Sequence, residues 1–248
     1  MLFQSGYSSL VRLSDCLKMG VGNAFETAKE VTSLHRKHAG AFKDIREIAR
    51  KQLADMEAGE TPSDDELKAA SSRIPLDEAL YVTSLQGRLH AETLSVILTS
   101  CFTLESYINS LGFLLLRDQF CGAFERSSTL TKWERIGKFK SEHGFDKGKP
   151  PFQELKILFR FRDDHVHDKV AAWGSDVSKT RYNGKLPDPL AGLLTLSHAV
   201  FACDTYWGMV LRVHELVGLP LSEFHRHYNL RPWFNDEFEQ EVRQAAAE

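Results

Sequence analysis

The chain has 248 residues, of which 42% are hydrophobic and 26% are charged, and its formal net charge is −3. These values are typical of a globular protein, and they exclude a chain-wide basic field that would attract nucleic acid or an anionic membrane. No uncharged apolar run approaches the roughly 20 residues that span a bilayer. The first 20 residues include Arg12, Asp15 and Lys18, which is unlike a signal-peptide core. We therefore expect a cytoplasmic protein that makes no membrane contact.

The cysteines and histidines show no metal-binding spacing. The four cysteines lie far apart and form no CxxC pair, so we expect them to be reduced. They are Cys16, Cys101, Cys121 and Cys203. His35 and His38 are three residues apart but have no third ligand nearby, which favours a solvated helix face. We predict neither a metal nor a cofactor.

The first 75 residues are predicted to form an N-terminal helical arm. Residues 1–22 have a weak pattern and contain three glycines, so they are expected to be an irregular lead-in. From Asn23 to about Ala58, apolar residues recur at helical spacing, although Gly40 weakens the middle of this helix. Ser63 and Glu66 resemble a capping box for a short helix that ends near Ser72.

The longest helical pattern follows Pro75 and runs from about Leu76 to about Gln119. Its second half is apolar on most sides, which is typical of a helix at the centre of a bundle. Glu105 and Asn109 are polar exceptions, four residues apart and therefore on one face. A buried carboxylate needs a partner, and arginine is the usual one.

The remaining elements complete an all-α fold. We expect a short helix over 131–142, a helix that begins near Pro151, a long apolar helix over 190–216, and short helices over 222–229 and from 236 to the end. The predicted architecture is an antiparallel helical bundle with two long central helices, an N-terminal helical arm and short C-terminal helices. Its expected parts are residues 1–75 for the arm, 76–218 for the bundle and 219–248 for the C-terminal helices.

Residues 159–169 form the densest cluster of Arg, Asp and His in the chain. Helical spacing places Arg162 on the inward stripe, whereas Asp163 and His167 share a neighbouring face. Arg162 and His167 are about 140° apart around an ideal helix. The two can meet on one phosphate only if the helix frays near His167, or if a second copy of the chain supplies the missing half.

Two interpretations of this cluster follow from the residues alone. Histidine can take a proton from a ribose 2′-hydroxyl and arginine can grip a phosphate, so the pair could cleave RNA without a metal. Thirteen Lys and Arg against eight Asp and Glu between residues 132 and 185 would suit a phosphate-facing surface, although this charge excess taken alone favours an ordinary solvated face. Alternatively, Arg162 is a structural partner of Glu105 and Asn109, and His167 is a cation at a helix end.

The segment 162–167, Arg-Asp-Asp-His-Val-His, resembles the hallmark of the HEPN family, in which an Arg, a polar residue and a later His lie on a bundle helix. The helix around Glu105 and Asn109, the Lys132-Trp133 pair and the approach over 151–155 resemble neighbouring features of that family. The resemblance covers about residues 76–216.

This resemblance implies a dimeric helical bundle in which the two hallmark segments face each other. It also implies metal-independent endoribonuclease activity in a toxin–antitoxin, defence or RNA-processing setting. His167 would be the general base or acid, Arg162 the phosphate contact and Asp163 their polar neighbour. Many family members lack activity, so the alternative is a non-catalytic HEPN-fold dimer that binds a protein or a nucleotide.

The expected partners follow from the same resemblance. They are RNA, a second copy of the chain bound through the motif helix, and a cognate antitoxin or other regulatory protein. We predict that Arg160, His165 and Lys169, which flank the hallmark residues, bind the substrate.

Overall fold

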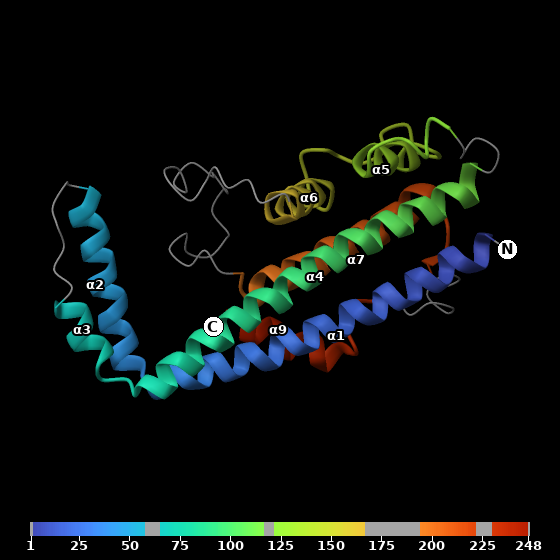
Figure 1. The fold of residues 1–248 in the computed structure, drawn as a ribbon. Coiled ribbons are helices and arrows are strands. Elements are labelled where there is room, and N and C mark those ends of the chain that lie inside the picture. The colour runs from blue at the N-terminus through green and yellow to red at the C-terminus, as the bar shows by residue number, and fades with distance from the viewer. Residues whose placement is uncertain (1, 58–64, 117–121, 167–193, 222–229, 248) are drawn as a thin grey trace.

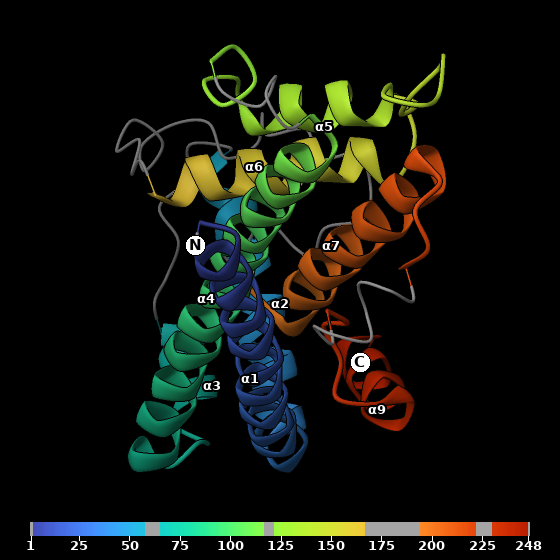
Figure 2. The same cartoon turned by 90° about the vertical axis from the view of Figure 1, so that its right-hand side faces the viewer.

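The computed structural model describes residues 2–57, 65–116, 122–166, 194–221 and 230–247, and in these ranges the fold is helical with no strand. Three long helices pack together: α1 (Leu2–Lys37), α4 (Leu76–Leu116) and α7 (Leu196–Val217) (Figure 1). The α1 helix runs antiparallel to α4, whereas α7 runs in the same direction as α4 (Figures 1 and 2). The predicted all-α bundle is therefore confirmed, with one parallel pair of helices inside it.

Two shorter helices lie across this bundle. The α5 helix (Thr129–Gly137) and the α6 helix (Phe152–Val166) cross α4 and α7 on the side opposite to α1 (Figures 1 and 2). Trp133 of α5 and Phe152, Leu155 and Leu158 of α6 are fully buried in the core. The apolar lead-in of the motif therefore anchors α6 on the bundle, as its helical spacing predicted.

The first helix is longer than the sequence predicted. The expected irregular lead-in over 1–22 is wrong, because α1 is helical from Leu2 and buries Leu10 and Leu17 completely. Gly20 explains the error: a Cβ atom there would lie 3.1 Å from Val96 Cγ2 of α4. The glycine that weakened the sequence pattern allows the two helices to approach closely. This helix is part of the core and not of a separate arm.

Only the second half of the predicted arm projects from the bundle. The α2 helix (Ala39–Glu57) and the α3 helix (Asp65–Ser71) extend beyond the end of the α1–α4 pair (Figure 1). The chain turns at His38, where Glu78 of α4 accepts hydrogen bonds from Lys37 Nζ at 2.7 Å and pairs with His38 Nε2 at 2.5 Å. These hydrogen bonds from Lys37 and His38 lower the pKa of Glu78. The Glu78 carboxylate thus fixes the junction between α1 and α2 to the start of α4.

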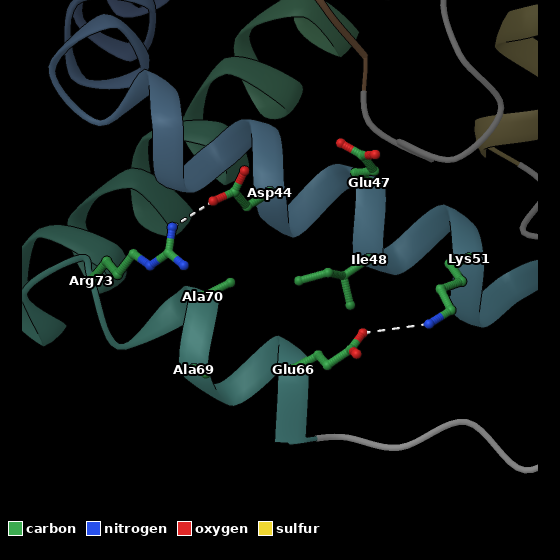
Figure 3. A pocket seen from close by; sticks show the side chains of 8 residues that line it. All are labelled: Asp44, Glu47, Ile48, Lys51, Glu66, Ala69, Ala70 and Arg73. Atoms are coloured by element: carbon green, nitrogen blue, oxygen red, sulfur yellow. Dashed lines mark hydrogen bonds and ion pairs between the residues drawn. The ribbon is translucent and has the colours of Figure 1, made fainter.

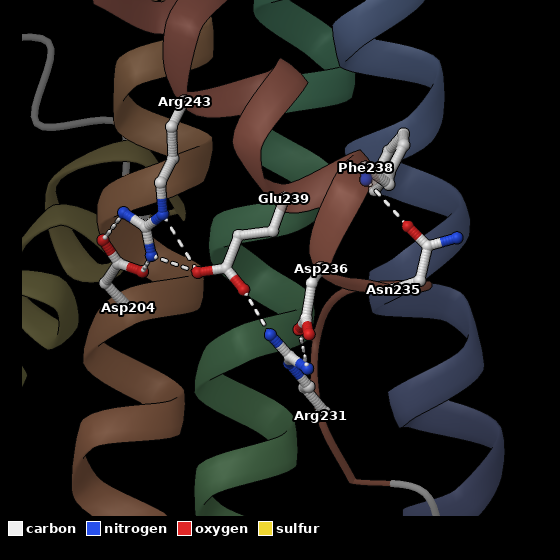
Figure 4. A network of polar contacts seen from close by, with 7 residues as sticks. All are labelled: Asp204, Arg231, Asn235, Asp236, Phe238, Glu239 and Arg243. Atoms are coloured by element: carbon white, nitrogen blue, oxygen red, sulfur yellow. Dashed lines mark hydrogen bonds and ion pairs between the residues drawn. The ribbon is translucent and has the colours of Figure 1, made fainter.

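The C-terminal helix α9 (Asp236–Ala247) is held against α7 by a network of charges (Figure 4). Arg243 donates two hydrogen bonds to Asp204 of α7, at 2.8 and 2.6 Å. Glu239 accepts from Arg243 at 2.8 Å and from Arg231 at 2.6 Å. The Arg243 guanidinium also lies 5.5 Å from the ring centroid of buried Trp233. The predicted helix at the C-terminus is therefore confirmed.

Most predicted helices are present in the structure, with ends that differ by up to six residues from the expected ones. The helices expected over 63–72, 76–119 and 131–142 are α3, α4 and α5, and the one expected over 190–216 is α7, which begins at Leu196. The helix expected over 222–229 lies outside the described residues. Of the helices that are described, none combines the length and the apolar character needed to cross a membrane.

Candidate functional site

The hallmark segment lies where the buried stripe of α6 reaches the surface. Leu155 and Leu158 are fully buried and Phe159 is 5% exposed, so one side of α6 is held tightly by the bundle. Arg162 follows Phe159 on the same side, and its side chain is 25% exposed. The guanidinium therefore lies at the edge of the core and not inside it.

Two neighbours on its own helix fix the orientation of Arg162. Its Nε and Nη2 atoms donate to Asp163 Oδ1 at 3.0 and 2.7 Å, and its Cζ atom lies 4.7 Å from the centroid of the Phe159 ring. The Asp163 side chain is 49% exposed. The ion pair uses Nε and Nη2 and leaves Nη1 outside it. The hallmark Arg and its polar neighbour are thus in direct contact at a surface that solvent reaches.

The predicted structural partners of Arg162 are not the ones that the structure pairs with it. Among the described residues, the ion pair of Arg162 is with Asp163 and not with Glu105. Asn109 also has another partner, because its Oδ1 accepts from Lys132 Nζ of α5 at 2.9 Å. Lys132 is only 5% exposed, so this contact joins α4 to α5 inside the molecule. Helical spacing placed Glu105 and Asn109 on one face of α4, but it could not show that Lys132 of α5 packs against that face.

A buried thiol lies beneath this site. Cys101 Sγ of α4 lies 3.9 Å from the Leu158 carbonyl of α6, and burial raises the pKa of the Cys101 thiol to about 12. The charges of Arg162, Asp163 and Glu105 also act on this thiol, so all three lie in its neighbourhood. Cys101 stays protonated near neutral pH and provides no nucleophile.

The other predicted site residues are placed only in part. Arg160 is exposed on α6, and its role in binding a substrate stays a prediction. His165 lies within α6, but its side chain is outside the described part of the structure. His167 and Lys169 also lie outside the described residues. The structure therefore brings Arg162 and Asp163 together, and both the position and the catalytic role of His167 stay predictions.

Two histidines that the sequence did not single out, His198 of α7 and His90 of α4, accept hydrogen bonds from the backbone at the start of α7. His198 is 7% exposed and packs edge-on against Phe161, with 5.6 Å between the ring centroids. Its Nδ1 accepts from the Thr195 backbone N–H at 3.1 Å, and His90 Nδ1 of α4 accepts from the Leu194 N–H at 2.9 Å. Both rings therefore serve as acceptors for backbone donors at the helix start. The only sequence signal was Thr195 three residues before His198, a spacing like that of a capping box.

No group of three or more His, Cys, Asp or Glu side chains in the described ranges could hold a metal ion. His35 and His38, the weak candidates from the sequence, make other contacts. The His35 ring lies 4.5 Å from that of Phe42, and His38 pairs with Glu78. Both histidines therefore help to fix the turn between α1 and α2.

Comparison with known proteins gives no relative from which a function could be transferred. No family model matches the chain, and no curated protein or solved structure is detectably similar to it. Any function of the chain must therefore be inferred from the geometry around Arg162.

Proposed function

We propose that the protein is a HEPN-like, metal-independent endoribonuclease that acts as a homodimer through α6. The observation that supports this proposal is the exposure and the orientation of the Arg162 side chain. Its guanidinium is 25% exposed and is oriented by Phe159 and Asp163, instead of being locked into a core pair with Glu105. A purely structural arginine on the inward stripe would be expected to have such a core pair.

The chemistry follows from the two hallmark residues. A phosphate oxygen binds Arg162 through Nη1, the nitrogen that the pair with Asp163 does not use, and the positive charge stabilises the transition state. His167 takes the proton of the ribose 2′-hydroxyl, and the resulting oxygen attacks the adjacent phosphorus. The bond to the 5′-oxygen breaks, and that oxygen takes up the proton that His167 removed from the 2′-hydroxyl. The products are a 2′,3′-cyclic phosphate and a 5′-hydroxyl.

The directions of Arg162 and His167 are the reason for including a second copy of the chain. Arg162 and His167 diverge by about 140° on an ideal helix, so unless the helix frays near His167 one chain alone does not point both side chains at one phosphate. A twofold axis beside the surface end of α6 would bring His167 of the second copy to Arg162 of the first. Such an isologous contact uses the same surface of both chains.

The alternative function, a non-catalytic HEPN-fold dimer that binds a protein or a nucleotide, has one observation in its favour. The Asp163 carboxylate already occupies two donors of Arg162, and its negative charge repels an incoming phosphate. Asp163→Asn separates the two functions. In a nuclease this substitution should raise cleavage, because the competing charge is removed. In a binding module it should create no cleavage.

The decisive assay is RNA cleavage in the presence of a chelator. We expect wild-type protein to cut RNA, and we expect Arg162→Ala and His167→Ala each to reduce the rate by roughly 10²–10³-fold. Arg212→Ala, at an exposed residue in the second half of α7 that pairs with Glu215, is the matched control and should keep full activity. A substrate with 2′-deoxyribose at the cleavage site should remain intact. Equal rates for wild type and both hallmark variants would refute the proposal.

A further inference from the structure

The projecting helix α2 is less covered than any other long helix in the described part of the chain. It has 19 residues, and none of those whose side chains are described is buried. Its apolar residues Ala41, Phe42, Ile45 and Ile48 are only half-buried. An isolated helix of this length is marginally stable in water, and most helical stability comes from packing of the apolar face. The short α3 helix supplies only part of that packing.

A groove of about 530 Å³ separates α2 from α3 (Figure 3). Ile48, Ala69 and Ala70 line its apolar part, and Figure 3 shows the Ile48 side chain pointing between the two helices. An ion pair closes each end: Arg73 with Asp44 at 2.5 Å, and Lys51 with Glu66 at 3.7 Å. An apolar channel with charged ends is the kind of surface that receives an amphipathic helix.

The charges of α2 indicate which helix would fit. This helix carries four basic and four acidic residues, so its formal charge is zero and it favours neither a polyanion nor a polycation. Asp44 and Lys51 lie seven residues apart on the groove side, with Glu47 and Ile48 between them. If a second α2 lies antiparallel, with a twofold axis between residues 47 and 48, each Asp44 meets Lys51 of the other copy. The same axis brings the two Ile48 side chains together.

We propose that the α2–α3 groove is a docking surface for the α2–α3 pair of a second copy of this chain, which forms a four-helix bundle about a twofold axis. Asp44 and Lys51 make the two ends of the α2 face self-complementary in charge, and Ile48 makes its centre apolar, as an isologous contact requires. The existing ion pairs at its ends are largely exposed and contribute little, so they can exchange partners at small cost. This contact is separate from the α6 contact and does not depend on the proposed nuclease activity.

Site-directed cross-linking tests the contact directly. In a chain with Cys16→Ser and Cys121→Ser, Ile48→Cys places a thiol next to the twofold axis. Arg46→Cys is the matched control, because Arg46 is exposed and lies about 200° around the helix from Ile48. Under mild oxidation of the purified protein, Ile48→Cys should give a covalent dimer on a non-reducing gel, and Arg46→Cys should not.

Sedimentation velocity provides the second readout. Ile48→Glu puts two carboxylates at the axis and should lower the association state, whereas Arg46→Glu should leave it unchanged. RNA cleavage is measured on the same samples, so a failure of this contact can be told apart from a failure of the nuclease proposal. Equal cross-linking of both cysteine variants, no cross-linking of either, or a cross-link that forms only in cells and with a different polypeptide would overturn the proposal.

Discussion

Replacing Tyr107 with phenylalanine should destabilise the bundle, because its hydroxyl belongs to a buried hydrogen-bonded chain. The Tyr107 hydroxyl contacts His214 Nε2 of α7, and His214 Nδ1 lies 3.0 Å from the Leu219 carbonyl oxygen. A carbonyl can only accept, so the imidazole proton is on Nδ1 and Nε2 accepts from the tyrosine. Tyr107 and His214 are 1% and 3% exposed, which leaves little access for water.

The size of the effect follows from this burial. Removing one partner of a buried hydrogen bond costs about 1–3 kcal/mol in the free energy of unfolding. For a chain of this length, each kcal/mol corresponds to a fall in Tm of about 2–4 °C. Tyr81→Phe is the matched control, because the Tyr81 hydroxyl bonds to Glu30 at the surface and Tyr81 is 47% exposed. Its loss should change stability by less than about 0.5 kcal/mol.

Urea denaturation at pH 7.5 measures both variants against wild type. The m-value should stay constant, so that the shift in midpoint reports stability alone. If Tyr107→Phe lost no more stability than Tyr81→Phe, the argument from the buried chain of hydrogen bonds would be refuted.

Two further predictions concern pH and glycine. Burial lowers the pKa of His214 and His35 below 6.5, so the unfolded chain binds these protons more readily. The contribution of the two neutral histidines to the free energy of unfolding should be complete above about pH 6.5, and it should be lost as the pH falls through their folded-state pKa values. Urea denaturation between pH 7.5 and 5.5 measures this change. A free energy of unfolding that rises towards pH 5.5 would contradict the prediction. Gly87→Ala should stabilise α4 by about 0.5–1 kcal/mol, because a Cβ there meets nothing within 4 Å. Gly137→Ala should cost about 1–3 kcal/mol, because its Cβ would lie 2.5 Å from the Phe145 ring. Thermal melting compares the two variants, and equal shifts in Tm would exclude the space around the added Cβ atom as the cause.

The helices could be predicted from the sequence because each depends on a local pattern. Apolar spacing located α4, α6 and α7, and Gly218 does end α7 with a left-handed backbone at φ 65°. The pattern failed for α1, where Gly20 looked like a helix breaker. Its role depends on Val96, 76 positions later in the chain, and no local pattern contains that information.

The candidate site shows the same division between local and long-range information. The position of Arg162 at the end of a buried stripe could be predicted from helical spacing. The partner of Arg162 could not be predicted in this way. The guanidinium bonds to Asp163 on its own helix, whereas the expected partner was Glu105 on α4. Asn109 pairs with Lys132, which comes from an element whose docking position the sequence did not give. Which side chains form a hydrogen bond depends on how far each one extends from its helix, and helical periodicity does not contain this information.

The packing of α1 on α4 has a consequence for synthesis on the ribosome. The α1 helix emerges before its partner α4, which begins at Leu76, so the buried face of α1 is exposed while the intervening segment is translated. The next long partner, α7, ends at Val217, which is 217 − 116 = 101 residues after the end of α4. At about 5–20 residues per second, the α1–α4 pair therefore waits roughly 5–20 s for α7. During that time the nascent chain presents an apolar helical hairpin, which is a typical substrate for co-translational chaperones.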